Sequence, residues 1–241
     1  MERTVRFLSQ GQLIVANLYH LVAKEKLILM SHGLEGSKDG SKWQAIAEKA
    51  PKAGFGTLRF NYRGCGEGIE ASEGEFLDST LTNRISDYRS AIDYVYSIDT
   101  NIGNIGVIGS SFGGMVALAA EDVRVKAMVL LATPIHISMN IGHGEIHGTE
   151  TEVSPLLPEQ IYDDVNRYDI SKSIGRINCP LLILHGSEDD IVPVEHAYDL
   201  YRYANEPKHL LIVDGADHSF SNTAHIEYIV ELSLAHFTKY L

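Results

Sequence analysis

The chain has 241 residues, of which 44% are hydrophobic and 22% charged, so it can bury a sizeable core in one large domain or two small ones. Twenty lysine and arginine residues against 32 aspartate and glutamate residues give a net charge of -12, and no basic run offsets it. A surface of that charge repels nucleic acid and anionic membranes on average, so neither is expected as a partner.

Short apolar runs punctuated by glycine begin the chain. Residues 5–8 and 13–20, separated by Gly11 and Gln12, are typical of an N-terminal β-hairpin. A buried strand is predicted at residues 27–31, followed by a glycine-bearing loop and a helix over residues 43–50. The pattern then repeats, with a strand at residues 57–61, a second glycine loop and a long amphipathic helix at residues 81–95.

The same alternation continues to the end of the chain. Strands are predicted at residues 105–108, 125–132, 181–185 and 209–213, and helices at residues 112–120, 194–203 and 223–241. This order is typical of an α/β architecture, a mostly parallel sheet covered by helices on both faces. Because no internal repeat or linker divides the chain, residues 1–241 are expected to form a single domain.

Residues 134–176 interrupt this rhythm, since they hold no strand-length apolar run and only one plausible short helix near residues 158–168. An insertion of this kind is usually functional or mobile, and we expect a cap over the site. Between residues 134 and 169 the only lysine or arginine is Arg167, whereas acidic residues are frequent. They are Glu145, Glu150, Glu152, Glu159, Asp163, Asp164 and Asp169. So negative a cap disfavours polyanionic substrates such as acyl-CoA.

Compartment and anchoring are predicted from what the sequence lacks. Cys65 and Cys179 do not form a C-x-x-C or Cys/His motif, and two cysteines do not make a secreted scaffold, although a single disulfide between them stays open. The first ten residues have no apolar core, and the longest apolar runs are far shorter than a membrane span. We therefore expect a soluble protein of a reducing cytoplasm.

A candidate nucleophile lies between a predicted strand and a predicted helix. The run Gly109-Ser110-Ser111-Phe112-Gly113 matches G-x-S-x-G, and Ser111 is the only serine with glycine both two residues before it and two residues after it. The strand-to-helix context is what this motif requires, because the helix N-terminus points free N–H groups at developing negative charge. The alternative is a plain glycine-rich turn.

A serine needs a base, and the base needs a carboxylate to orient it. His218 lies just after the last predicted strand, where parallel-sheet sites are built, although a solvated loop histidine is the alternative. After the preceding strand come Glu188, Asp189 and Asp190, of which Asp189 is the first choice and Asp190 the reserve. A solvated acidic turn that caps the next helix is the alternative for these acids.

An oxyanion hole would complete the site with two backbone donors. One is expected to be the N–H of Phe112, directly after the candidate nucleophile. The other is expected to be the N–H of Leu34, in the loop that follows residue 31.

These motifs together resemble the α/β-hydrolase superfamily over nearly the whole chain. They are His32-Gly33-Leu34, Asn61-Tyr62-Arg63-Gly64-Cys65-Gly66-Glu67-Gly68, Gly109-Ser110-Ser111-Phe112-Gly113-Gly114, His185-Gly186-Ser187-Glu188-Asp189 through Val192-Pro193, and Gly215-Ala216-Asp217-His218. Within the superfamily the chain is similar to small serine esterases related to cinnamoyl and feruloyl esterases, and to the dienelactone-hydrolase and prolyl-oligopeptidase-like branch. The resemblance implies the triad and oxyanion roles given above, with the cap inserted after the sixth strand. One departure is Gly68, where relatives often carry serine or threonine.

The leading prediction is a serine carboxylesterase that hydrolyses small to medium esters through an acyl-enzyme on Ser111, Asp189 and His218. A prolyl-oligopeptidase-like peptidase or an acyl thioesterase would use the same triad, although the chain is too short for the propeller domain of full-size oligopeptidases. A non-catalytic binding protein that kept the fold is the alternative of another class.

No cofactor is expected, and the expected partner is a small-molecule ester. Four candidate metal ligands, His136, His143, Glu145 and His147, cluster in the proposed cap. Neighbouring glycines argue against the helix that would align them, so no metal site is predicted. Both a monomer and a homo-oligomer stay open.

Overall fold

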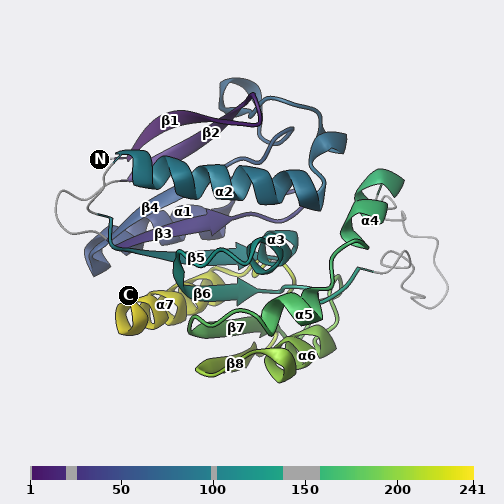
Figure 1. Cartoon of the computed structure of the whole chain (residues 1–241). Coiled ribbons are helices and arrows are strands. Elements are labelled where there is room, and N and C mark those ends of the chain that lie inside the picture. The colour runs from purple at the N-terminus through teal and green to yellow at the C-terminus, as the bar shows by residue number, and fades with distance from the viewer. Residues whose placement is uncertain (1, 20–25, 99–101, 138–157) are drawn as a thin grey trace.

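A single eight-stranded sheet organises the protein. The computed structural model describes residues 2–19, 26–98, 102–137 and 158–241 (Figure 1). The strands are β1 (Glu2–Ser9), β2 (Gln12–Tyr19), β3 (Lys26–Ser31), β4 (Phe55–Phe60), β5 (Asn104–Ser110), β6 (Val125–Leu131), β7 (Leu181–Gly186) and β8 (Lys208–Val213). Their order in the sheet is β1-β2-β4-β3-β5-β6-β7-β8. β2 pairs antiparallel with β1 and β4, and every other neighbouring pair is parallel.

Helices connect the parallel strands and cover the sheet. Those in the described ranges are α1 (Ser41–Lys49), α2 (Leu81–Ile98), α3 (Phe112–Ala120), α4 (Glu159–Val165), α5 (Ile170–Ile174), α6 (Glu195–Tyr203) and α7 (Thr223–Tyr240). Short 3-10 turns follow α1 and precede α2, at Ala50–Ala53, Gly68–Glu70 and Phe76–Asp78. None of these helices is long and apolar enough to cross a membrane.

Helices bury both faces of the sheet. Successive residues of its inner strands point to opposite sides, so neighbours in one strand enter different cores. In β3, Leu27 and Leu29 pack into the core that α2, α3, α5 and α6 cover. Their neighbours Ile28 and Met30 pack into a second core beneath α1 and α7. The α/β fold class is confirmed, and each predicted strand and helix is present with ends within three residues of the prediction.

The expected cap is described only in part. Residues 138–157 lie outside the described residues, and with them His143, Glu145 and His147. Residues 158–176 form α4, where the sequence predicts a short helix, and α5, which it does not predict. A cap over residues 134–176 therefore stays a prediction.

The described end of this segment is fastened to the body of the protein. The backbone N–H and the hydroxyl of Thr82, in the first turn of α2, each donate to the Asp164 carboxylate of α4 at 2.7 Å. Ile161 of α4 and Ile174 of α5 are fully buried in the larger core. In Figure 1, α4 lies outside the main helix layer, on the side where β6 ends.

Candidate active site

The loops that carry the candidate residues follow four parallel strands at one edge of the sheet. β3 and β5 end in register, with Ser31 paired to Gly109, and β7 and β8 end with Gly186 paired to Val213. Because the strands are parallel, the loops that leave their carboxyl ends gather at the same edge, where α/β proteins bind their ligands.

Ser111 occupies a sharp turn between β5 and α3. Its backbone has φ 53° and ψ -124°, which is an uncommon conformation for a residue with a side chain. The N–H of Ser111 donates to the carbonyl oxygen of Leu131 at 2.8 Å, and so ties the turn to the end of β6. This turn places Ser111 at the N-terminus of α3.

Two glycines allow the first turn of α3 to pack this closely. A Cβ on Gly113 would lie 2.2 Å from the carbonyl oxygen of Ser31, and one on Gly114 would lie 2.0 Å from Oγ1 of Thr133. Both distances are far below van der Waals contact. Any side chain at these positions would push α3 away from β3 or β6, and would move Ser111 with it.

The candidate acid and base are in direct contact. Nδ1 of His218 lies 2.9 and 3.0 Å from the two carboxylate oxygens of Asp189. Asp189 also accepts the backbone N–H groups of Ile191 at 3.0 Å and Val192 at 2.7 Å, and its Oδ2 lies 3.1 Å from Nε2 of His185. Burial raises the pKa of Asp189, but the hydrogen bonds from both histidines and from Val192 outweigh it and hold the pKa well below its usual range.

The structure separates the two neighbouring candidate acids. The Asp189 side chain is 0% exposed and the His218 side chain 18% exposed, whereas Asp190 is an exposed residue. Within the described ranges, no hydrogen bond joins Asp190 to His218, and none joins the Ser111 hydroxyl to the His218 ring. In ligand-free enzymes the bond between nucleophile and base is often long, and it tightens only when substrate is bound.

The loop after β3 lies directly beside Ser111. A Cβ built on Gly33 would be 3.4 Å from Cβ and 3.9 Å from Oγ of Ser111. Among the described residues, neither the N–H of Leu34 nor that of Phe112 has a hydrogen-bond acceptor. Within the described ranges, the two expected oxyanion donors are therefore unpaired.

Two basic groups next to this edge, the buried His32 and the half-buried Lys42, had no predicted role. Burial, helped by the charge of Arg84, lowers the pKa of His32 to about 3, so this ring is neutral behind the loop. Lys42 lies beside the His218 loop, with Nζ 3.4 Å from the carbonyl oxygen of Ser219. Burial lowers the pKa of Lys42 to about 8, although the carboxylates of Asp217 and Asp189 oppose that shift.

Sequence reasoning also missed Arg84 and the contact of His185 with Asp189. Arg84 is fully buried on the same face of α2 as Leu81 and Tyr88. An arginine inside an apolar helical face was a signal in the sequence that something polar lies beneath it. For His185 the signal was weaker, because a histidine at a strand end is often a packing residue.

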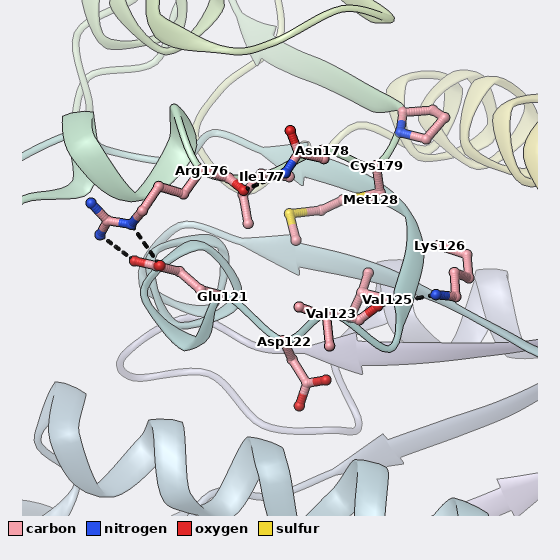
Figure 2. Close-up of a pocket in the computed structure, with 11 residues that line it drawn as sticks. Glu121, Asp122, Val123, Val125, Lys126, Met128, Arg176, Ile177, Asn178 and Cys179 are labelled. Atoms are coloured by element: carbon pink, nitrogen blue, oxygen red, sulfur yellow. Dashed lines mark hydrogen bonds and ion pairs between the residues drawn. The ribbon is translucent and has the colours of Figure 1, made fainter.

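Two hollows can be compared as binding sites. One of about 290 Å³ lies at the start of β6, where Arg176 pairs with Glu121 (Figure 2). Burial raises the pKa of Cys179 in its wall to about 11, so this thiol is protonated and a poor nucleophile. The other, of about 660 Å³, has Leu34 in its wall, the residue after the Gly33 that lies next to Ser111, but neither Ser111 nor His218 lines it. Its lining includes Leu34, Phe76, Glu35, Asp39, Glu67 and Glu70.

Metal binding has no support in the part of the chain that the structure describes. There, no group of three or more histidine, cysteine, aspartate or glutamate side chains could hold an ion. Of the four residues weighed as ligands, His136 is described, and its ring packs against that of His196 with centroids 4.5 Å apart.

Gly68 has a backbone reason to differ from the serine or threonine expected at its position. Its φ of 55° lies in the left-handed region, which favours glycine.

Two curated proteins are similar to this chain in sequence. The chain is 29% identical over 194 residues to the uncharacterized protein YfhR of Salmonella typhi, which covers 79% of this chain but only 63% of that relative's length. It is 26% identical over 250 residues to the human mitochondrial palmitoyl-protein thioesterase ABHD10, covering 94% of this chain and 78% of the relative.

Solved structures show the fold. Est1E from Butyrivibrio proteoclasticus, determined with ferulic acid bound, superposes with a TM-score of 0.79 at 20% identity, over 96% of this chain and 98% of that one. The α/β-hydrolase GrgF from a Penicillium species superposes with a TM-score of 0.81 at 20% identity, over 100% of this chain and 99% of that one. The sequence profile of the prolyl oligopeptidase family matches residues 43–241. The chain therefore belongs to the prolyl oligopeptidase family and has the α/β-hydrolase fold.

Proposed function

We propose that the protein is a serine carboxylesterase with Ser111 as nucleophile, His218 as base and Asp189 as the acid that orients the base. The observation that carries this proposal is the contact between the buried Asp189 carboxylate and Nδ1 of His218 at 2.9 Å. With Nδ1 held in this way, the imidazole keeps its proton there and presents Nε2 to the nucleophile. We place this activity in the cytoplasm, on the sequence features given above.

The reaction follows from this arrangement. Oγ of Ser111 attacks the ester carbonyl carbon while Nε2 of His218 takes the hydroxyl proton, and the N–H groups of Leu34 and Phe112 bind the oxyanion. Collapse of the tetrahedral intermediate breaks the bond to the alkoxy oxygen, which leaves as alcohol with the proton from His218. Water then attacks the acyl-enzyme, His218 takes its proton, and the carboxylic acid departs as Ser111 regains its hydroxyl.

The lining of the cavity beside Leu34 favours small to medium esters of low charge as substrates. Its apolar lining includes Leu34 and Phe76, whereas carboxylates supply its charged lining. Carboxylates repel anionic groups of a substrate, so a neutral acyl or alcohol group is the better occupant.

A thioesterase is the second candidate, because a relative that aligns over 94% of the chain is a palmitoyl-protein thioesterase. Ester and thioester hydrolysis share the same acyl-enzyme, as does peptide hydrolysis. Parallel assays of a p-nitrophenyl ester, an acyl thioester and a peptide amide on one preparation separate the three. We expect the ester to have the largest kcat/KM, and a larger value for either rival would replace the carboxylesterase assignment.

The proposal is tested by Ser111→Ala, with Ser110→Ala as the matched control. We expect Ser111→Ala to lower turnover of p-nitrophenyl acetate and butyrate by at least about 10⁴-fold, because no other group can form the acyl-enzyme. Ser110 is buried at the end of β5, and its alanine variant should stay within a few-fold of the parent enzyme.

Labelling with a fluorophosphonate gives an independent readout. The parent and Ser110→Ala proteins should take up one equivalent and the Ser111→Ala protein none. Turnover by Ser111→Ala at the parent rate would refute the proposed nucleophile. Absence of both turnover and labelling in the parent would favour a non-catalytic binding protein.

A further inference from the structure

Arg84 is a buried cation that the proposed reaction does not use. Its side chain is fully inaccessible to solvent. Among the described residues, no carboxylate lies within ion-pair distance of its guanidinium group. A buried charge of this kind is costly unless other polar groups satisfy it, so the identity of those groups indicates what the arginine does.

Its two terminal nitrogens donate to backbone carbonyl groups of the loop beside Ser111, and Nη2 also lies 3.4 Å from Sγ of Cys65. Nη1 of Arg84 donates to the carbonyl oxygen of Gly33 at 3.0 Å, and Nη2 donates to that of Leu34 at 2.6 Å. Nε donates to Oγ of Ser79 at 2.8 Å, which orients the guanidinium plane. The fork of the arginine thus grips two consecutive peptide groups of the loop.

This grip fixes the direction of the Leu34 N–H. The carbonyl of Gly33 and the N–H of Leu34 belong to one planar trans peptide, so they point in opposite directions. The Gly33 carbonyl oxygen lies 3.0 Å from Arg84, 2.7 Å from Nδ1 of His32 and 3.2 Å from the backbone nitrogen of Gly36. With its carbonyl end held by these groups, the peptide cannot turn its N–H away.

The side chain of the second expected donor residue, Phe112, contacts the same guanidinium group. The carbon atom of the Arg84 guanidinium lies 5.2 Å from the centroid of the Phe112 ring and 4.6 Å from that of Tyr62. Both rings are buried, which strengthens contact between a cation and an aromatic face. The Phe112 ring extends from the residue whose N–H is the second donor.

We propose that Arg84 is a positioning residue that holds the Leu34 and Phe112 N–H groups in the geometry of the oxyanion hole. This inference rests on the proposed function, because it assumes that these two groups bind a developing oxyanion. Arg84 touches no substrate. It acts by keeping both donors in place before the reaction, which is what makes such donors effective.

The test replaces Arg84 by lysine, which keeps the charge but cannot grip two carbonyl groups with one planar fork. We expect Arg84→Lys to lower kcat for p-nitrophenyl butyrate by about 10- to 100-fold with KM nearly unchanged, somewhat less than loss of a whole oxyanion donor. Affinity for an alkyl boronic acid should fall by a similar factor, since its tetrahedral adduct on Ser111 places an oxygen in the oxyanion hole.

Arg63→Lys is the matched control. Arg63 is also a buried arginine, but its side chain pairs with Asp87 at 2.6 Å and is directed to Ser9 and Gln10, away from the loop beside Ser111. Its lysine variant should lose thermal stability while kcat and boronic acid affinity stay near the parent values. The fluorophosphonate labelling endpoint counts the folded sites in each preparation, so kcat is compared per reactive Ser111.

A milder variant decides the question if Arg84→Lys does not fold. Ser79→Ala removes the hydroxyl that accepts the hydrogen bond from Nε of Arg84. It should lower kcat and boronic acid affinity together by several-fold at constant KM. Parent values of both quantities in folded Arg84→Lys, or in Ser79→Ala where the lysine variant is unfolded, would overturn the inference. The proposed function fails separately, if Ser111→Ala keeps its activity.

Discussion

Asp189 carries its charge at a position that water does not reach, and the donors around it determine its chemistry. Four groups, from His185, Ile191, Val192 and His218, lie at hydrogen-bond distance from its two oxygens. Since its pKa in the folded protein is lower than in the unfolded chain, its ionised form stabilises the fold. That contribution is fully present above the ordinary pKa of an aspartate, about 3.9, and is lost as pH falls through the lower pKa of the folded protein.

Asp189 and Asp190 make a matched pair for testing the proposed acid. Asp189→Asn should lower kcat by about 10⁴-fold with little change in KM, because the amide stabilises the wrong tautomer of His218. Asp190 is exposed and makes no hydrogen bond or ion pair with His218 in the described structure, so Asp190→Asn should stay within about two-fold of the parent enzyme.

Steady-state kinetics on p-nitrophenyl butyrate, with the unfolding midpoint as a check on folding, measures both variants. A larger loss of kcat in Asp190→Asn than in Asp189→Asn would show that the reserve residue is the acid.

At the residue scale, a functional residue can be predicted from the sequence where it belongs to a motif. A residue whose role depends on contacts with distant parts of the chain cannot. Ser111 can be found because its flanking glycines are required by the turn. The choice between Asp189 and Asp190 depends on which neighbour faces His218, and adjacent residues cannot be distinguished by spacing. No role can be assigned to Arg84 from its place in the sequence, because the carbonyl groups to which it donates hydrogen bonds lie about 50 positions earlier in the chain.

At the scale of elements, burial on both faces makes the parallel strands easy to predict, because each is a short continuous apolar run between glycines. By contrast, α5 has five residues, which is less than two helical turns and too short for a periodic pattern to emerge. Its helix exists because Ile170 and Ile174 pack into the core, which is tertiary information.

The close approach of α3 to the end of β6 gives a prediction about two elements. Gly114→Ala should lower the free energy of unfolding by about 3 kcal/mol, the upper part of the range for overpacking, despite the better helix propensity of alanine. Thr133→Ala removes two of the three Thr133 atoms that the new methyl would meet, so it should restore part of that loss in the double variant. Urea unfolding of both single variants and of the double variant measures the coupling.

Gly103→Ala is the control, because a Cβ there meets nothing within 4 Å. Its free energy of unfolding should stay within about 0.5 kcal/mol of the parent value. If the effects of Gly114→Ala and Thr133→Ala simply add, the two elements are not in the contact described here.

For the whole molecule, the net charge of -12 matters most where it is concentrated near the site. Of the acids lining the cavity beside Leu34, Asp39 and Glu70 are each paired with the buried ammonium group of Lys38. Within the described structure, Glu35 and Glu67 line the same cavity without an ion-pair partner. The cavity therefore carries net negative charge, in line with the acidic composition of the predicted cap.

This charge predicts how ionic strength acts on substrates of different charge. For butyryl-CoA, whose phosphate groups are anionic, kcat/KM should rise several-fold as NaCl increases from 20 to 300 mM, because salt screens repulsion from the acidic surface. For p-nitrophenyl butyrate, which has the same acyl group and no net charge, it should change by less than about 1.5-fold. Glu35→Gln/Glu67→Gln should raise kcat/KM for butyryl-CoA at low salt and reduce its salt dependence. Equal salt dependence for the two substrates would show that the charge around the cavity does not select against anions.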